Sequence, residues 1–208
     1  HGDPTRPWNA FSIDFLNPDG SENLCYEGNW RDIFQNWEAL SLSYPDFCCS
    51  MVFRFVNAST ADGYNPYRIS KDGIDWEVIA ADDPWGNIGY WGDHQIIYLL
   101  KLLEWCKRFT PRQLDRWLDD QRCAYAQVPY RIRGYEDIRR NPQQTIDFDD
   151  QLAREIETRV AGFGEDGKLL PGAEGTPCHV TLAEKLLVPV LVKITNFVPG
   201  GGVWLNTQ

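Results

Sequence analysis

Two short stretches carry the residue types that bind a neutral sugar. The first begins a helix predicted over residues 29–43, whose polar side carries Arg31, Asp32, Gln35 and Asn36. The second is a loop that runs into another helix start, and it carries Trp85, Trp91, Asp93 and His94. A pyranose presents hydroxyls, which pair with charged hydrogen-bonding groups, and an apolar C–H face, which packs on a flat ring. The two stretches therefore predict a sugar-binding site, provided that their helices are neighbours.

These residues also have structural interpretations, which the sequence leaves open. Arg31 and Asp32 fit an ion pair at a helix start, which contributes little at a surface. Trp85 and Trp91 fit a hydrophobic core equally well, since burial is the usual place of tryptophan. Asp93 fits an N-cap, with its carboxylate accepting from the first unpaired backbone N–H groups.

Catalysis of glycoside cleavage requires further groups besides those that bind the sugar. It needs a carboxylic acid near the leaving oxygen, together with a second carboxylate or an inorganic phosphate as nucleophile. Loop and helix-start carboxylates of this region are Asp75, Glu77, Asp82, Asp83 and Asp93. Asp83 and Asp93 are the catalytic candidates, although loop carboxylates are usually solvated, and a histidine such as His94 is more often structural than catalytic. No cluster has metal-ligand spacing, so no metal and no organic cofactor is expected.

Two helices predicted over 93–109 and 182–197 are apolar on nearly all sides, which is typical of helices enclosed by neighbours. The first directly follows the aromatic loop. The second contains Pro189, which predicts a kink or an interruption. Both are expected to be inner helices, with Leu100 and Leu187 almost fully buried.

The remaining pattern also favours helices. Residues 1–28 predict coil and a β-hairpin around an Asn-Pro-Asp-Gly turn. Further helices are predicted to begin at Pro45, at Thr110-Pro111 and at Asp147, the last one ending near Gly162. Short turns between helices alternate with long aromatic loops, a pattern that indicates helical hairpins in two concentric layers. The predicted fold is therefore mainly α, a portion of an α/α toroid over 29–208.

Composition excludes several classes of partner. The chain has 208 residues with a net charge of −10, which opposes binding to nucleic acid or to an anionic membrane. No apolar run reaches transmembrane length and no signal peptide is visible. Six cysteines without a C-x-x-C pair are expected to be reduced and mostly structural, which favours a cytoplasmic protein.

The segment Arg31-Asp32-Ile33-Phe34-Gln35-Asn36, followed by Gly92-Asp93-His94 at the start of an apolar helix, resembles the catalytic toroid of the cellobiose and chitobiose phosphorylase family and its six-hairpin glycosidase relatives. Those enzymes line their sugar pocket with an Arg-Asp-x-x-Gln-Asp helix start and a Ser-Asp-Asp helix start. Here Asn36 replaces the second Asp of the first motif, and His94 replaces an acid of the second.

The resemblance implies roles for these positions. Arg31 and Asp32 would bind hydroxyls of the sugar at the cleavage point, Gln35 would support them, and Asp93 would either stand at the pocket floor or hold a neighbouring residue. The general acid of the family lies in a Gly-Asp-Trp-Asn-Asp motif, and residues 201–206 look like its lead-in. By this interpretation the chain is a fragment that ends before the acid, and the rest of the parent chain or a second copy completes the barrel.

The function expected is that of a glycoside phosphorylase or hydrolase, which cleaves a neutral oligosaccharide with inversion and has inorganic phosphate as a possible co-substrate. The alternative is a non-catalytic carbohydrate-binding or interaction domain on the same scaffold. A toroid acting on isoprenoids is disfavoured, because such a site has clustered Asp with Mg²⁺ or a dry pocket.

Overall fold

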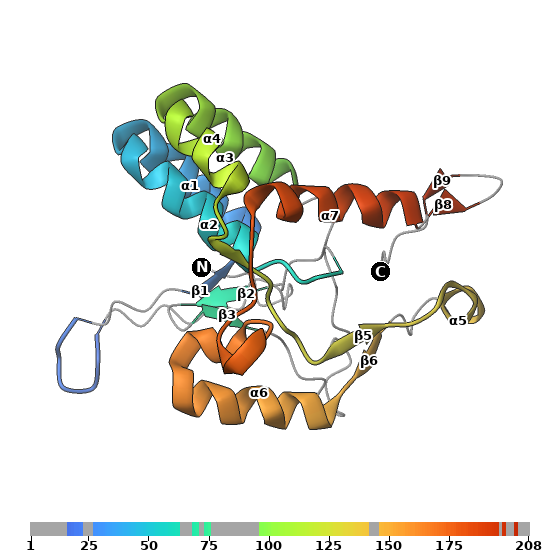
Figure 1. Cartoon of the computed structure of the whole chain (residues 1–208). Helices are drawn as coiled ribbons and strands as arrows, with labels where there is room; N and C mark the ends of the chain where they lie inside the picture. The colour runs from blue at the N-terminus through green and yellow to red at the C-terminus, as the bar shows by residue number, and fades with distance from the viewer. Residues whose placement is uncertain are drawn as a thin grey trace.

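The computed structural model describes residues 16–22, 27–62, 68–70, 73–75, 96–141, 146–195, 197–198 and 202–203. This part of the chain is mainly helical, as predicted. Its α-helices are α1 (Trp30–Ser43), α2 (Cys48–Asn57), α3 (Ile96–Phe109), α4 (Pro111–Asp119), α5 (Tyr135–Arg140), α6 (Asp150–Phe163) and α7 (Leu182–Thr195). Figure 1 shows α1–α4 gathered on one side, α6 on the other, and a small sheet between them.

The first four helices form two antiparallel hairpins. A short 3₁₀ turn, η2 (Pro45–Phe47), joins α1 to α2, and the Ser41 hydroxyl meets the Met51 sulfur across this turn at 3.4 Å. Thr110 alone separates α3 from α4. The predicted helix starts at Pro45 and Pro111 are confirmed. Proline suits these positions because the first backbone N–H groups of a helix have no partner within the helix.

Equivalent helices of the two hairpins run in the same direction. Phe53 of α2 packs edge-on against Trp117 of α4, with ring centroids 4.3 Å apart. One turn earlier on each helix, the Cys49 sulfur lies 3.0 Å from the Gln113 side-chain oxygen. Because both contacts advance together along α2 and α4, these two helices are parallel.

The core of this bundle contains three cysteine thiols. Cys48, Cys49 and Cys106 are buried where α2 packs on α3, and the sulfurs of Cys49 and Cys106 are 4.0 Å apart. Burial raises the pKa of Cys106, so its thiol is neutral. All five cysteines in the described residues are free, which agrees with the prediction of unbridged, structural thiols.

Short strands surround the bundle. An antiparallel sheet contains β1 (Glu27–Asn29), β2 (Arg68–Ser70) and β3 (Gly73–Asp75) in that order. Two-stranded pairs join β4 (Cys123–Ala124) to β7 (His179–Val180), β5 (Tyr130–Ile132) to β6 (Ile146–Phe148), and β8 (Phe197–Val198) to β9 (Gly202–Val203). The strand β1 runs directly into α1, so the sheet fixes the place where α1 begins.

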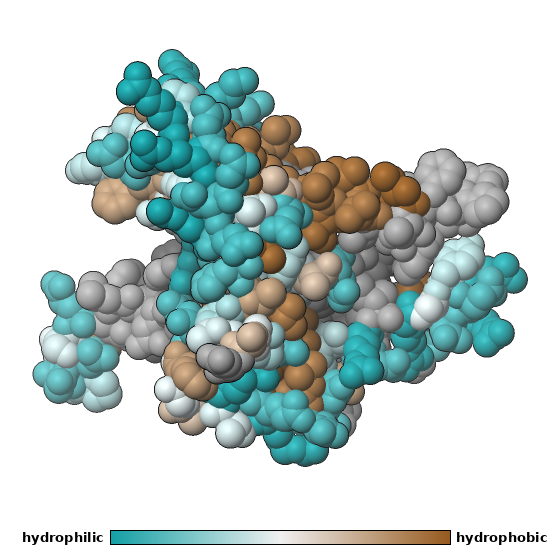
Figure 2. All heavy atoms as spheres, viewed as in Figure 1, coloured by the Kyte–Doolittle hydropathy of each residue, from teal (hydrophilic) through white to brown (hydrophobic). Residues whose placement is uncertain are grey.

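The prediction that Leu100 and Leu187 are buried is wrong. Their exposed fractions are 56% each. In α3 the buried side holds Leu99, Leu102 and Cys106, whereas Leu100 lies on the opposite side of the helix. A helix with apolar residues on all sides need not be packed against other helices on all sides. Helix α7 likewise leaves a hydrophobic strip on the surface (Figure 2).

The ends of two later helices also differ from the predictions. The N-cap of α6 is Asp149, whose side chain accepts from the Leu152 amide, and Asp147 instead lies in β6 beside Arg133. The C-cap is Gly164 with φ of +62°, and not Gly162. Helix α7 continues through Pro189 and ends at Thr195. Because the three-residue strand β6 ends at Phe148, the helix begins later than the sequence pattern indicates.

A capping box begins α7. The Glu184 amide donates to the Thr181 hydroxyl at 3.1 Å, and the Thr181 amide donates to the Glu184 carboxylate at 2.8 Å. None of the helices in the described residues is both long and apolar enough to cross a membrane. Of the hairpin predicted within residues 1–28, the described part shows a bridge from Leu16 to Glu22 that closes a turn, and the flanking residues 1–15 and 23–26 lie outside it.

Candidate functional site

The candidate site lies at the end of the bundle where α1 and α3 begin. The rings of Phe34 in α1 and Tyr98 in α3 stack with centroids 4.7 Å apart. Further along both helices, the Lys101 ammonium lies 3.7 Å from the Glu38 carboxylate. Both contacts advance in the same direction, so α1 and α3 are parallel neighbours and their N-terminal ends lie side by side.

This arrangement meets the condition that the sequence left open. The backbone of α1 places Arg31, Asp32 and Gln35 in its first two turns, and Asn36 is exposed on the same helix. Asp83, Trp85, Trp91, Asp93 and His94 lie outside the described residues. Helix α3, which pairs with α1, is described from Ile96 onward.

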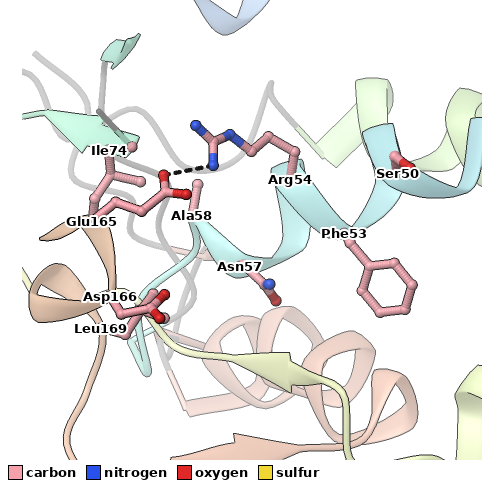
Figure 3. A pocket seen from close by; sticks show the side chains of 10 residues that line it. Ser50, Phe53, Arg54, Asn57, Ala58, Ile74, Glu165, Asp166 and Leu169 are labelled. Carbon is pink, nitrogen blue, oxygen red and sulfur yellow. Dashed lines mark hydrogen bonds and ion pairs between the residues drawn. The ribbon is translucent and has the colours of Figure 1, made fainter. Parts of the chain in front are cut away.

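A cleft of about 340 Å³ lies at the same end of the bundle. Helix α2 is antiparallel to α1, so its last turns, which line the cleft, lie near the start of α1. The opposite wall comes from β3 and from the 3₁₀ turn η3 (Gly164–Lys168). The polar side chains that line the cleft are Ser50, Arg54, Asn57, Glu165 and Asp166 (Figure 3).

Two charged contacts hold the walls of the cleft together. Arg54 Nη1 of α2 donates to Glu165 Oε2 of η3 at 2.9 Å, and Figure 3 shows these side chains pointing toward one another. Lys168 Nζ donates to the Ile74 carbonyl of β3 at 2.7 Å. Helix α2, turn η3 and strand β3 therefore form one connected frame.

Gly73 allows β3 to approach η3 closely. Its φ is +95°, which a glycine adopts without strain, and a Cβ at this position would lie 3.1 Å from the Glu165 side chain. A larger residue would therefore press on the carboxylate that pairs with Arg54.

The lining offers both donors and acceptors of hydrogen bonds. Asn57 Oδ1 accepts from the Ala124 amide at 3.0 Å, which fixes the side-chain amide with its NH₂ group as the remaining donor. Glu165 and Asp166 are carboxylates that accept, and the guanidinium of Arg54 is a fork of donors. Ala58, Ile74 and Leu169 add an aliphatic surface. Such a mixture suits a neutral, polyhydroxylated ligand better than a purely apolar one.

A buried lysine contacts the chain at Ser59, the residue after Ala58 of the cleft lining. Lys185 of α7 is 4% exposed, and its Nζ donates to the Ser59 carbonyl at 3.0 Å and lies 3.8 Å from the centre of the Tyr125 ring. Burial lowers the pKa of Lys185 to about 7, and Cys123 opposes this shift. Burial also raises the pKa of Cys123 to about 11. In the described residues no group of three His, Cys, Asp or Glu side chains is arranged to hold a metal ion.

Sequence patterns gave no signal for the cleft. Arg54 lies on the polar side of α2, and Glu165 and Asp166 follow the predicted end of α6, where no further element was predicted before residue 182. The pairing of Arg54 with Glu165 joins positions 111 residues apart, which no local pattern reveals. The turn signal at Gly164 is the one local clue that the chain reverses there.

No model of a known protein family matches this sequence, and no characterised protein is significantly similar to it.

Proposed function

We propose that this chain is a portion of a carbohydrate-active catalytic domain with an α/α toroid fold. The activity proposed is that of a glycoside phosphorylase or hydrolase, which cleaves a neutral oligosaccharide with inversion. The observation that carries the proposal is the parallel pairing of α1 and α3 through Phe34–Tyr98 and Glu38–Lys101. It brings the helix start with Arg31 and Asp32 beside the helix that follows Asp93 and His94.

The bundle also supports the proposed toroid. Helices α1 and α3 run one way, and α2 and α4 run the other way, so successive hairpins repeat the same orientation. An α/α toroid is built by this repetition, with one set of parallel helices facing inward. The exposed strip on α7 and the exposed side of α3 are the surfaces that further hairpins of such a toroid would cover.

The chemistry proposed for the site follows from the residue types. Arg31 and Asp32 bind sugar hydroxyls through charge-assisted hydrogen bonds, and Gln35 and Asn36 extend this polar surface. Trp85 and Trp91 supply flat rings for the C–H face of the sugar. Asp93 contacts the sugar at the pocket floor. Inorganic phosphate is the co-substrate if the bond is cleaved by phosphorolysis.

Calorimetric titration of the purified protein with β-linked di- and oligosaccharides tests the proposal. We expect Asp32→Ala to weaken binding by about 10- to 150-fold, because a hydrogen bond to a charged group contributes about 1.5–3 kcal/mol. The matched control is Asp46→Ala, since Asp46 is exposed in η2 at the opposite end of α1. If Asp32→Ala and Trp91→Ala both retain the wild-type affinity and helical content, the sugar site is elsewhere and the proposal is wrong.

A further inference from the structure

The cleft and the start of α1 belong to the same sheet. Gly28 of β1 is paired with Ile69 of β2, and Ile69 is paired with Ile74 of β3, which lines the cleft. Neighbouring strands are about 4.8 Å apart, so two spacings place the cleft wall about 10 Å from the strand that leads into α1. A single extended ligand can therefore reach both the first turn of α1 and the cleft.

The charges of the cleft exclude other small ligands. The lining contains two carboxylates, those of Glu165 and Asp166, and one guanidinium, that of Arg54, so its charge does not suit an anion. Arg54 and Glu165 already neutralise one another at 2.9 Å, which leaves little attraction for a cation. In the described residues no third His, Cys, Asp or Glu side chain joins these two carboxylates in a group that could hold a metal ion. A neutral ligand with many hydroxyls matches the remaining mixture of acceptors, donors and aliphatic surface.

The polar groups of the cleft are also accessible. The side chains of Arg54 and Glu165 are 32% and 48% exposed, and Ser50 and Asp166 are exposed. Their frame is fixed by the contacts of Arg54, Lys168 and Gly73, so a ligand finds these groups already in place. Preorganised groups lose little conformational freedom on binding.

We infer that the cleft between α2, β3 and η3 binds a further sugar residue of the same oligosaccharide whose cleavage point lies at the starts of α1 and α3. This inference rests on the proposed function and makes it more specific. The preferred substrate is then longer than a disaccharide, with its distal part held by Asp166, Asn57 and the Arg54–Glu165 pair.

The test compares β-linked oligosaccharides of two to six units by calorimetry on the purified protein. For the wild type we expect affinity to rise with chain length. Asp166→Ala removes an acceptor, and Ser50→Trp fills the cleft from an exposed position. Asp166→Ala should weaken binding of the hexasaccharide by about 10- to 150-fold, as expected for loss of a hydrogen bond to a charged group. Ser50→Trp should also weaken it by about 10-fold or more, because the indole occupies the space of the bound sugar. Neither should change the affinity for the disaccharide.

Matched controls separate the cleft from general effects. Asp46→Ala and Ser43→Trp make the same changes at exposed positions near the other end of α1, and they should bind every oligosaccharide as the wild type does. If affinity is independent of length, or if both cleft variants bind the hexasaccharide normally, the cleft is not a sugar site, while the proposed function survives. If no sugar of any length binds, both the inference and the proposed function fail.

Discussion

At the scale of single residues, Lys185 is the most unusual group in the described chain. A lysine is seldom removed from water, because its charged form is costly in a medium of low dielectric constant. Its carbon stem is buried, and its amine donates to the Ser59 carbonyl and lies over the Tyr125 ring. The lowered pKa means that part of the population carries a neutral amine near pH 7.

This residue makes the stability of the fold depend on pH. The unfolded chain has the ordinary lysine pKa of 10.5, and the folded chain has a value of about 7. Between these values the unfolded state binds one more proton, so the free energy of unfolding increases as pH rises from 7. We expect wild type to gain about 1 kcal/mol between pH 7 and 8 and about 1.3 kcal/mol between pH 8 and 9, relative to Lys185→Met. Urea unfolding of both proteins at pH 7, 8 and 9 measures this difference.

The comparison is confined to pH 7–9 because Cys123 also changes the pH dependence of stability at higher pH. Cys123 has a raised folded pKa of about 11, so above its ordinary value of 9.0 it destabilises the fold as pH rises. Lys107→Met, which changes an exposed lysine of α3, serves as the control and should follow the wild type at all three values. A wild-type curve parallel to that of Lys185→Met would mean that Lys185 is not buried in solution.

At the scale of elements, the start of α6 depends on one carboxylate. Asp149 Oδ1 accepts from the Leu152 amide at 3.0 Å, and Oδ2 lies 3.2 Å from Arg131 Nη2. Asp149→Ala should lower the free energy of unfolding by about 1 kcal/mol, which is typical for loss of an N-cap. Asp149→Asn keeps an acceptor for the amide and should recover most of this loss. Chemical denaturation of the three proteins provides the measurement.

The control for this prediction is Glu157→Ala, an exposed position in the middle of α6. It should remain within about 0.5 kcal/mol of wild type, as most surface substitutions do. Equal stabilities for Asp149→Ala and Glu157→Ala would contradict the capping role.

Elements were predictable where local chemistry determines them. The periodicity of 29–43 gave α1, and the Thr110-Pro111 step gave α4, because amphipathic patterns and proline at a helix start act within a few residues. The strands β2 and β3 were not predicted, since three-residue strands have too few residues to show alternation. For the same reason β6 displaced the predicted cap of α6 from Asp147 to Asp149.

The candidate site could be predicted only in part. The sequence pattern predicts that Arg31 and Asp32 lie at the start of a helix. That this helix start is next to α3 depends on the stacking of Phe34 on Tyr98, which exists only in the tertiary structure. The exposure of Leu100 depends equally on which side of α3 its neighbours occupy. The cleft depends on Arg54 and Glu165, which are distant in sequence, so no periodicity could reveal it.

At the scale of the whole molecule, the described part of the chain exposes a strip of apolar side chains on α7. Leu187, Val190 and Ile194 are 56%, 52% and 65% exposed, and their spacing places them on one side of the helix. The opposite side is packed, with Leu182 buried and α4 as a neighbour. Contiguous exposed patches of this kind are rare on monomeric proteins and favour contact with other apolar surfaces.

The strip on α7 offers an apolar surface to a hydrophobic probe. In solution it should bind the dye 8-anilinonaphthalene-1-sulfonate, and Leu187→Gln with Ile194→Gln should remove most of the fluorescence enhancement. Glutamine has nearly the helix propensity of leucine, so α7 and the unfolding midpoint should be retained. Leu16→Gln with Leu42→Gln replaces side chains of similar exposure, 62% and 59%, on separate elements, and this control should leave the fluorescence unchanged. A fall in the unfolding midpoint of the α7 variant, with no change in fluorescence, would show that Leu187 and Ile194 are packed inside the fold, and α7 would then be an enclosed helix after all.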